Sequence, residues 1–586
     1  MPNGTLALGT RQQGFWQRVD SEVWIRRLLI ALLCIWMLAV VVLPLGTLLS
    51  KSLVNQDGEF VGLANFIKYF QTPALSSSLG NSMFVAVLTT LISVSLGFGF
   101  AYALTRTCLP MKGMFKGLAL TPIFAPTLLN GIALVYLFGR KGLITLGFFG
   151  HLDFLAVDIG LYGPVGIIIS EVIFTFPQAM LILTIALSMT DARLYEASDS
   201  LGASKLRTFF TVTIPSIKYG LISAVFVCFI LAFTDFGAPK VVGGNYNILA
   251  TDIYKQVIGQ QNFVMGAVVS VVLLVPTVLA FSVDRIVQRK QVSLIAAKSV
   301  PLIPKPEPLR DRIFLTFCSL IAFLIIAFYL TALFASLVKV WPYTIELGLW
   351  HYDFTGTGGG GYTAFFNSIR MALYSAAIGV GLTFASAYLI EKTRGLKALR
   401  GIAYFLSILP LALPGLVIGL AYIFFFNAPG WSFWGITIPN PLNFLYATMG
   451  ILVMSNIVHF YTVSFLTATT ALKQLDKEFE TVSESMGVPF YRTFFRVTVP
   501  VCLPAVLEIF MYYFVNSMAT VSAVIFLYSA DTKLASVAVA NMDDAGDIAP
   551  ACAMAMLIVV ANIAMRIIYG LVTKGAKRKT QAWTVR

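Results

Sequence analysis

The sequence is poor in charged residues: Asp, Glu, Lys and Arg together make up 12% of it, while hydrophobic residues make up 58%. A typical soluble domain has about 25% charged and about 45–50% apolar residues. This composition excludes a soluble globular protein, and a single membrane anchor cannot explain it. Because the apolar runs are continuous and do not alternate with polar residues, they indicate a bundle of transmembrane helices and not a β-barrel.

Motifs for covalent chemistry and for phosphate binding are also missing. The sequence contains no G-x-x-x-x-G-K-[ST] loop, no Gly-Lys dipeptide at all, no nucleophile elbow and no H-E-x-x-H. Its three histidines, His151, His351 and His459, are far apart, and its six cysteines lie in or beside apolar segments without metal-ligand spacing. We therefore predict that the chain is not an enzyme and that it binds no cofactor or metal itself.

Long apolar stretches define the organisation of the chain, because about 20 apolar residues span the hydrocarbon core as a helix. The predicted parts are an N-terminal segment (1–27), a first repeat (28–290), a linker rich in Pro and Lys (291–311), a second repeat (312–573) and a basic tail (574–586). Twelve transmembrane helices are predicted, six in each repeat, at about 28–50, 81–105, 116–139, 161–188, 217–237, 264–287, 312–338, 367–390, 401–426, 445–470, 501–528 and 549–572.

Lysine and arginine give the chain a net charge of +14. For a polytopic membrane protein, this excess indicates basic cytoplasmic loops and not nucleic-acid binding. With the N-terminus in the cytoplasm, 32 of the 41 Lys and Arg residues fall on cytoplasmic segments and 9 on external ones. This bias supports the predicted helix count, and it places both termini in the cytoplasm.

One polar stretch occurs twice. Residues 195–215 (YEASDSLGASKLRTFFTVTIP) and residues 480–500 (ETVSESMGVPFYRTFFRVTVP) agree at seven of the nine positions in their C-terminal tails, and the copies are 285 residues apart. We call them the first and the second repeated stretch. Both lie in predicted cytoplasmic loops, and two matched stretches on one side of a membrane protein predict two docking points for a partner outside the bilayer.

The repeat extends beyond these stretches. Asn81 and Ser82 recur as Asn367 and Ser368, and the third predicted helix of each half contains a P-x-x-x-P element. Because each half has six helices, both halves have the same orientation. The sequence therefore predicts two parallel repeats related by an axis along the membrane normal, with a pathway between them.

The first repeated stretch resembles the EAA loop of binding-protein-dependent ABC importer permeases. That loop has the pattern E-A-A, three residues, G, nine residues, I-x-L-P, and the stretch has Glu196-Ala197-Ser198, Gly202 and Pro215 at the corresponding positions. The resemblance implies a type I ABC importer-like fold and two copies of a cytoplasmic ATPase subunit, which bind the ATP and dock on the two stretches. It also implies a periplasmic solute-binding protein as a partner and a place in the bacterial inner membrane.

The second repeated stretch departs further from this pattern. Thr481-Val482-Ser483 occupy the E-A-A positions, so that Glu480 stands one place early and Glu484 three places late, and either acid could take the role of the pattern's glutamate. A short helix with aromatic bulk suits docking into a groove on a partner. The residues expected to couple the ATPase to the bundle are Glu196, Ala197, Gly202, Phe209, Phe210, Pro215, Glu480, Glu484, Gly487, Phe494, Phe495 and Pro500.

The fusion of both repeats in one chain resembles the ferric-iron, thiamine and 2-aminoethylphosphonate branches of this family. The segments around 351–354 and 391–395 are most similar to the 2-aminoethylphosphonate permeases. The first expected substrate is therefore 2-aminoethylphosphonate, with ferric iron and thiamine as alternatives. An ion-coupled secondary transporter, which is a different class of protein, can also have two six-helix halves. That alternative does not explain why one motif is copied into two equivalent loops.

Polar residues inside apolar spans are candidates for the transport pathway, because such groups are costly there and often functional. Asp235 is expected at the outer end of the fifth helix, facing the entry of the pathway. Glu171 and Glu508 lie nearer helix ends, where snorkelling or pairing explains them equally well. The other candidates, for each of which an interhelical hydrogen bond is the alternative, are Asn130, Asn456, His459, Asn516 and Thr520.

Overall fold

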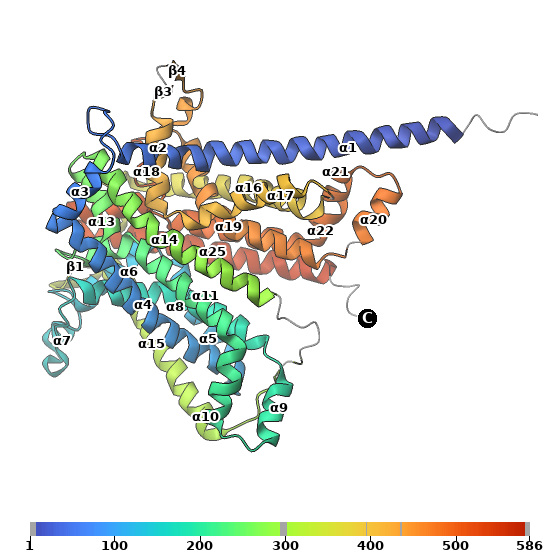
Figure 1. Cartoon of the computed structure of the whole chain (residues 1–586). Helices are drawn as coiled ribbons and strands as arrows, with labels where there is room; N and C mark the ends of the chain where they lie inside the picture. The colour runs from blue at the N-terminus through green and yellow to red at the C-terminus, as the bar shows by residue number, and fades with distance from the viewer. Residues whose placement is uncertain are drawn as a thin grey trace, which may run out of the picture.

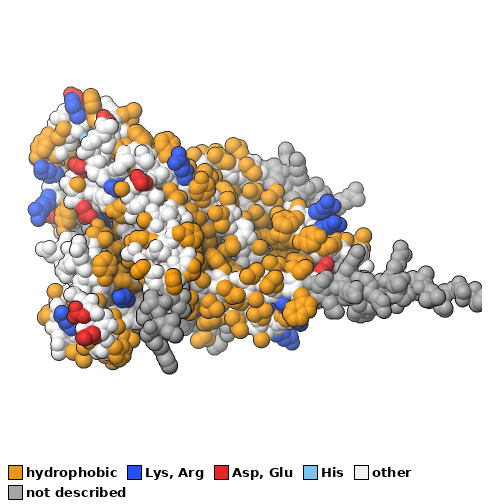
Figure 2. Space-filling model, turned by 90° about the horizontal axis from the view of Figure 1, so that it is seen from above, with side chains coloured by type: hydrophobic (Ala, Val, Ile, Leu, Met, Phe, Trp, Pro, Cys, Tyr) orange, Lys and Arg blue, Asp and Glu red, His pale blue; other side chains and the backbone are white. Residues whose placement is uncertain are grey.

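The computed structural model describes residues 8–292, 300, 302–393, 395–433, 436–476 and 478–580. In these ranges, nine helices are long and apolar enough to cross a membrane, and three bent pairs of helices raise the number to as many as twelve if each pair is one span. On the face drawn in Figure 2, a broad band of hydrophobic side chains separates two ends where charged side chains gather. The chain is an all-α polytopic membrane protein, as the apolar runs predict.

The first repeat is built of helices. In chain order they are α1 (Leu8–Met37), η1 (Leu38–Val42), α2 (Leu43–Ser52), α3 (Ala64–Gln71), α4 (Pro73–Arg106), α5 (Lys112–Ala119), η2 (Thr121–Phe124), α6 (Thr127–Phe138), α7 (Gly147–Gly150), η3 (Asp153–Leu155), α8 (Pro164–Ser188), α9 (Ala192–Ser200), α10 (Lys205–Thr208), η4 (Phe209–Thr213), α11 (Ile214–Thr234), α12 (Gly237–Val242), α13 (Leu249–Tyr254), η5 (Lys255–Gly259) and α14 (Phe263–Val292).

The second repeat adds two short antiparallel hairpins, β1–β2 and β3–β4. Its elements are α15 (Pro308–Leu337), β1 (Val338–Val340), β2 (Thr344–Leu347), η6 (Trp350–Tyr352), α16 (Gly361–Lys392), α17 (Lys397–Ile408), η7 (Leu409–Ala412), α18 (Gly415–Phe426), β3 (Gly430–Phe433), β4 (Ile436–Pro439), η8 (Asn443–Leu445), α19 (Met449–Gln474), α20 (Glu478–Ser485), α21 (Phe490–Thr493), η9 (Phe494–Thr498), α22 (Val499–Val501), α23 (Leu503–Ala519), α24 (Ala535–Ala545) and α25 (Ile548–Thr580).

Three spans that the sequence predicts as single helices are broken. The spans expected at 116–139 and 401–426 bend by 102° and 111°, and the span expected at 501–528 follows a bend of 79° and ends its helix at Ala519. The single-helix prediction was wrong for these segments because two prolines lie near each break (Pro122 and Pro126, Pro410 and Pro414, Pro500 and Pro504), and a proline nitrogen cannot donate to the helical ladder. Counted as bent pairs, the three segments still complete the predicted number of spans.

Helices also extend past the predicted limits of the parts. α1 begins at Leu8, inside the predicted N-terminal segment, and α25 ends at Thr580, inside the predicted basic tail. Within the predicted linker, residues 293–299 and 301 lie outside the described residues, as does the remainder of the tail. Pro308 begins α15, which suits a residue that lacks the backbone N–H a first turn does not need.

The first helices of the two repeats are exchanged between the halves (Figure 1). α1 and α2 pack against α16, α17 and α18, whereas α15 packs against α4, α5 and α6. The Tyr422 hydroxyl donates to the Val40 carbonyl over 2.9 Å, and the Tyr329 hydroxyl donates to Oδ1 of Asn130 over 2.9 Å. The units that pack together therefore differ from the units that repeat in the sequence.

The repeated Asn-Ser pair has the same structural task in both halves. The Ser82 and Ser368 hydroxyls accept hydrogen bonds from the backbone amides of Leu249 and Ala535, the first residues of α13 and α24, over 2.8 and 2.7 Å. The side-chain amide of the preceding asparagine donates to a backbone carbonyl shortly before the same helix, over 2.9 Å in each half. The Asn and Ser residues that recur in the sequence thus make the same contacts in both halves.

The two repeats meet near α13 and β1 and diverge toward the repeated stretches (Figure 1). The first stretch begins in α9 and the second in α20, and these lie at the tips of the two diverging arms. We call the side of the molecule with α9 and α20 the loop end, and the side with α13 and β1 the far end. The start of α1 and the end of α25 are also on the side of the loop end (Figure 1).

The helix exchange predicts that the halves hold together without their covalent linker. Residues 1–295 and 296–586, co-expressed as two chains, should purify as one complex through a tag on either half, because α1 and α15 each pack against the other half. Co-purification in detergent followed by size-exclusion chromatography measures this. Removing residues 1–52 from the first half is the control, since it should weaken the complex. Two halves that purify separately would contradict the exchange.

Candidate functional site

Each repeated stretch folds as a short helix, a glycine turn and a second short helix. Gly202 joins α9 to α10 and Gly487 joins α20 to α21, and both glycines have φ of +67°. The amide of the residue after each glycine returns to a carbonyl five residues back, from Ala203 over 3.1 Å and from Val488 over 3.0 Å. This left-handed turn explains the fixed glycine, because an L residue with a side chain is strained there.

A pair of hydroxyls closes each helical hairpin. Oγ of Ser198 lies 2.7 Å from Oγ1 of Thr208, and Ser483 makes the same contact with Thr493 ten residues further on. Ser198 stands where the EAA pattern has its second alanine. A serine therefore replaces this alanine in both copies, and its hydroxyl joins the two helices of each hairpin.

A π-helical segment follows each hairpin, over η4 and η9, and leads into a proline. Pro215 and Pro500 have no N–H to offer the carbonyl four residues earlier. That missing bond favours the wider π-helical turn seen before each of them. Both prolines thus shape the entry into the next transmembrane helix, α11 in the first repeat and α23 in the second.

One aromatic residue of each Phe-Phe pair packs inward and the other points out. The ring of Phe209 lies 5.8 Å from that of Phe98, and the ring of Phe494 lies 4.8 Å from that of Tyr388, measured between centroids. Phe210 and Phe495 are 62% and 68% exposed. Other large apolar side chains exposed on the two stretches are Leu201, Leu206, Val482, Met486 and Tyr491. Exposed apolar groups gathered on two matched hairpins are typical of a protein–protein contact.

The acidic residues of the two stretches have different partners. Glu480 forms an ion pair with Lys392 at 3.2 Å, and Glu484 lies 3.8 Å from Arg26. In the first stretch Glu196 is exposed, and Tyr195, which corresponds to Glu480, lies under the guanidinium of Arg106. Tyr195 and Glu480 occupy equivalent positions, and a cation–π contact anchors the first while an ion pair anchors the second. Neither Glu480 nor Glu484 occupies the position that corresponds to Glu196.

The exchanged helices also reach the repeated stretches. Arg26 of α1 lies 4.9 Å from the centre of the Phe490 ring, and Glu307, directly before α15, forms an ion pair with Lys205. The hydrogen bond from Lys205 lowers the pKa of the Glu307 carboxyl. Each stretch is therefore in contact with the first helix of the other repeat.

A cavity of about 900 Å³ lies between the two repeats. It extends from Gln474, at the end of α19 beside the second stretch, to the breaks in the two bent spans at Pro126 and Pro414. α8 and α11 form one wall, and α19 and α23 form the other. This arrangement agrees with a pathway between parallel repeats, open from the loop end.

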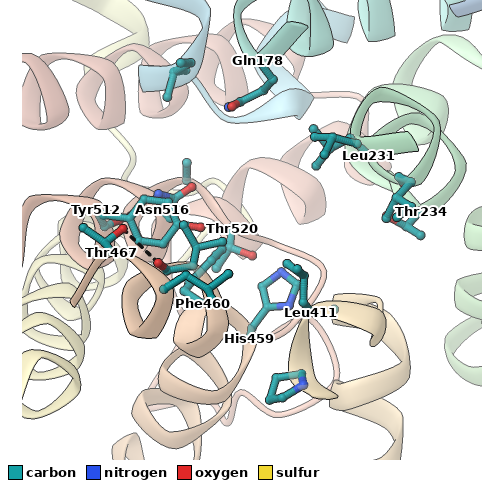
Figure 3. Close-up of a pocket in the computed structure, with 18 of the residues that line it drawn as sticks. Gln178, Leu231, Thr234, Leu411, His459, Phe460, Thr467, Tyr512, Asn516 and Thr520 are labelled. Atoms are coloured by element: carbon teal, nitrogen blue, oxygen red, sulfur yellow. Dashed lines mark hydrogen bonds between the residues drawn. The ribbon is translucent and has the colours of Figure 1, made fainter. Parts of the chain in front are cut away.

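The structure brings some of the predicted pathway residues to this cavity and not others. Asp235, Asn516, Thr520 and His459 line it, and Figure 3 shows the last three close together. Asn130 and Asn456 lie outside it: Asn130 is bonded to Tyr329 of α15, and Nδ2 of Asn456 donates to Sδ of Met371 in α16 over 3.1 Å. For these two residues, the structure contains an interhelical hydrogen bond, which the sequence analysis gave as the alternative to a role in the pathway.

The sequence analysis missed several polar residues that line the cavity. They include Gln178, Asp284, Thr467 and Tyr512, together with Glu508, which was assigned equally to helix-end pairing. Tyr512 has a hydropathy close to that of its neighbours and does not interrupt the apolar run. Its spacing was the available signal, because Glu508, Tyr512, Asn516 and Thr520 follow one another at intervals of four and so share one face of a helix.

A cluster of charges joins the repeats at the far end. Nζ of Lys240 in α12 lies 3.3 Å from Asp543 and 2.8 Å from Asp544 in α24, and the Tyr254 hydroxyl donates to Asp544 over 3.0 Å. The Lys240 side chain is only 7% exposed. Burial raises the pKa of Asp543, and Lys240 counteracts that rise. The cavity is thus separated from the far end by a contact between the halves.

Comparison with known proteins agrees with the duplicated architecture. The model of a family described as "Binding-protein-dependent transport system inner membrane component" matches the chain twice, at residues 110–293 and 377–578, which together cover more than half of it. Each match contains one repeated stretch and its glycine turn.

Among curated proteins, several long matches cover both repeats. A putative ferric transport system permease protein, FbpB 1 of Haemophilus influenzae, is 26% identical over 86% of this chain and 78% of its own length. A ferric transport system permease protein FbpB of Actinobacillus pleuropneumoniae is 26% identical over 87% of this chain and 73% of its own length. A shorter match, 29% identical, covers 37% of this chain and 68% of a spermidine/putrescine transport system permease protein PotC homolog of Mycoplasma genitalium.

The glycine turns predict a local and testable effect. Gly202→Ala and Gly487→Ala should each destabilise their own hairpin by about 1–2 kcal/mol, because φ of +67° disfavours a side chain. Hydrogen–deuterium exchange of the purified protein should be faster within the altered hairpin and unchanged elsewhere. Gly113→Ala is the matched control, since it is a helical glycine with open space around it. Unaltered exchange in both hairpin variants would contradict the turn.

Proposed function

The chain belongs to the family of inner membrane components of binding-protein-dependent transport systems, and from this premise we propose that it is the permease of an ATP-driven importer for ferric iron. Its relatives are transport permeases and not enzymes. In this proposal the chain supplies the pathway, and other proteins supply the energy and deliver the substrate.

The observation that carries the proposal is the pair of matched hairpins with outward-facing Phe210 and Phe495. Two equivalent apolar surfaces on one side of the bundle suit two copies of one ATPase subunit. ATP would be bound by those subunits, since this sequence has no phosphate-binding loop. Glu196 is exposed on the first hairpin, while the glutamates of the second already have partners, so we expect the first docking contact to be the more sensitive to mutation.

The proposed orientation has the loop end, with both termini, in the cytoplasm and the far end in the periplasm. The distribution of Lys and Arg supports it, because basic residues favour the cytoplasmic side. A periplasmic solute-binding protein would then dock at the far end. The cavity, open from the loop end and closed at the far end by Lys240, Asp543 and Asp544, corresponds to an inward-facing stage of transport.

For the substrate, the order of the sequence-based expectations is reversed. The sequence placed 2-aminoethylphosphonate first, but the relatives that span both repeats are named ferric transport permeases. The charges of the cavity favour a cation as well: among the described residues that line it, Asp235, Asp284 and Glu508 are acidic, and Arg285 is basic. A phosphonate group is an anion and is held best by charge-assisted bonds from cationic side chains.

The ion-coupled secondary transporter is less consistent with these observations. Such a protein needs no docking surface for an ATPase, whereas this chain presents two alike, each stabilised by the same glycine turn and hydroxyl pair. The thiamine alternative within the family has no support among the relatives described above.

The importer proposal predicts ATP-dependent uptake of ferric iron. The chain, co-expressed with the ATPase and binding protein encoded beside it and reconstituted in proteoliposomes, should accumulate ferric iron only with ATP inside the cytoplasmic compartment. The binding protein should bind ferric ion in preference to 2-aminoethylphosphonate and thiamine. Uptake in the absence of any ATPase subunit would refute the importer, and a binding protein selective for 2-aminoethylphosphonate would refute the substrate.

The docking role predicts a specific loss of the ATPase subunits. Phe210→Glu and Phe495→Glu should each reduce the amount of ATPase that co-purifies with the chain, because a carboxylate would be buried in an apolar contact, at a cost of several kcal/mol. Phe154→Glu is the control: Phe154 is also exposed, but it lies outside both hairpins. If all three variants retain equal amounts of ATPase, the hairpins are not the docking sites.

A further inference from the structure

The two walls of the central cavity differ in polarity at equivalent positions. The buried faces of α8 and α19 agree when residues 285 apart are compared: Glu171 and Asn456 are both fully buried, as are Leu187 and Leu472. The same spacing relates the two repeated stretches. Residues 285 apart therefore occupy equivalent places in the two halves.

At three such places in the middle of the cavity, both partners line it and only the partner in the second repeat is polar, whereas for Gln178 with Val463 and for Thr234 with Ala519 the polar partner is in the first repeat. His459 corresponds to Phe174, Tyr512 to Val227 and Asn516 to Leu231. Figure 3 shows His459, Tyr512 and Asn516 gathered on one side of the cavity, with Leu231 across from them. The fold is duplicated, but the chemistry of the wall is not.

The polar residues of the second repeat form a continuous track. Glu508, Tyr512 and Asn516 succeed one another at intervals of four along α23, over about 12 Å at 1.5 Å per residue, and Thr520 follows directly after the helix. Nδ2 of Asn516 already donates to the Tyr512 carbonyl over 2.8 Å, which leaves its Oδ1 as the acceptor. The track thus presents a carboxylate, a phenol, an amide oxygen and a hydroxyl.

His459 adds a nitrogen beside this track. Its Nδ1 is buried and has no hydrogen-bond partner among the described residues. A buried polar atom without a partner costs free energy unless something occupies the site. Within the part of the chain that the structure describes, no three His, Cys, Asp or Glu side chains gather into a metal-binding group. The track therefore offers successive weak contacts and no tight cage.

We propose that α19 and α23 of the second repeat carry the main contacts for the substrate in the middle of the pathway, with His459, Tyr512, Asn516 and Glu508 as successive contacts for a hard metal cation that retains part of its oxygen shell. Oxygen donors suit hard cations, and contacts along a pathway have to be weak enough to release what they bind. The side chains at the equivalent places in the first repeat, Phe174, Val227 and Leu231, are apolar and do not duplicate these contacts.

The proposal rests on the proposed function for the nature of the cargo, and exchange of equivalent residues tests it. In the complete importer, with its ATPase and binding protein, Asn516→Leu should lower ferric uptake about tenfold. Leu231→Asn, the mirror substitution on the other wall, should leave uptake within about twofold. ATP hydrolysis stimulated by the binding protein should be retained in both variants, because neither residue lies in the hairpins that dock the ATPase.

Tyr512→Phe keeps the ring and removes the hydroxyl, so it tests the track even if Asn516→Leu fails to fold, and it should lower uptake about fivefold. Equal losses in Asn516→Leu and Leu231→Asn would overturn the one-sided track, as would normal uptake in Asn516→Leu and Tyr512→Phe. A wild-type importer that takes up no ferric iron would refute the proposed function instead, and so the two failures are distinguishable.

Discussion

Backbone amides and carbonyls inside a bilayer have to find their partners within the protein, and the rest of this structure depends on that constraint. Irregular backbone is tolerated at membrane depth only where it is buried or lines a cavity, and the breaks in the bent spans follow this rule. Pro126 and Pro414, at two of the breaks, line the central cavity. The amides of Ala125 and Leu413 beside them still donate to carbonyls three residues earlier, over 3.3 and 3.1 Å. The pathway is thus placed where the helices can be interrupted.

The exchange of first helices gives the two halves a shared mechanical framework. α1 belongs to the first repeat but packs on the second, and Arg26 connects it to the second repeated stretch. α15 belongs to the second repeat but packs on the first, and the ion pair between Glu307 and Lys205 connects it to the first repeated stretch. A force applied to either stretch therefore acts on helices of both repeats. This geometry suits a protein in which movement at the loop end has to open contacts at the far end, where Lys240 joins α12 to α24.

Much of the fold could be predicted from the sequence, because apolar runs, recurring glycines and basic loops are local signals. Gly202 and Gly487 indicated the turns before any backbone angle was known. The bends could not be predicted, since hydropathy records that a segment is apolar and not the direction in which it runs. The helix exchange left no signal either, because apolar faces of α1 and α15 suit either half. For the cavity, polarity alone selected Asn130, which is bonded to a neighbouring helix, and passed over Tyr512, which a comparison of equivalent residues identifies.

The contact between Tyr422 and Val40 spans 382 residues of the chain. α1 and α2 leave the ribosome before the rest of the first repeat, yet α16, α17 and α18, against which they pack, are made only after the whole first repeat. At about 5–20 residues per second, roughly 20–80 s separate the synthesis of the two partners. During that interval the newly inserted α1 faces lipid or the insertion machinery with a surface that later becomes buried. Assembly of this protein in the membrane therefore includes a waiting period, which ends when α16, α17 and α18 have been made.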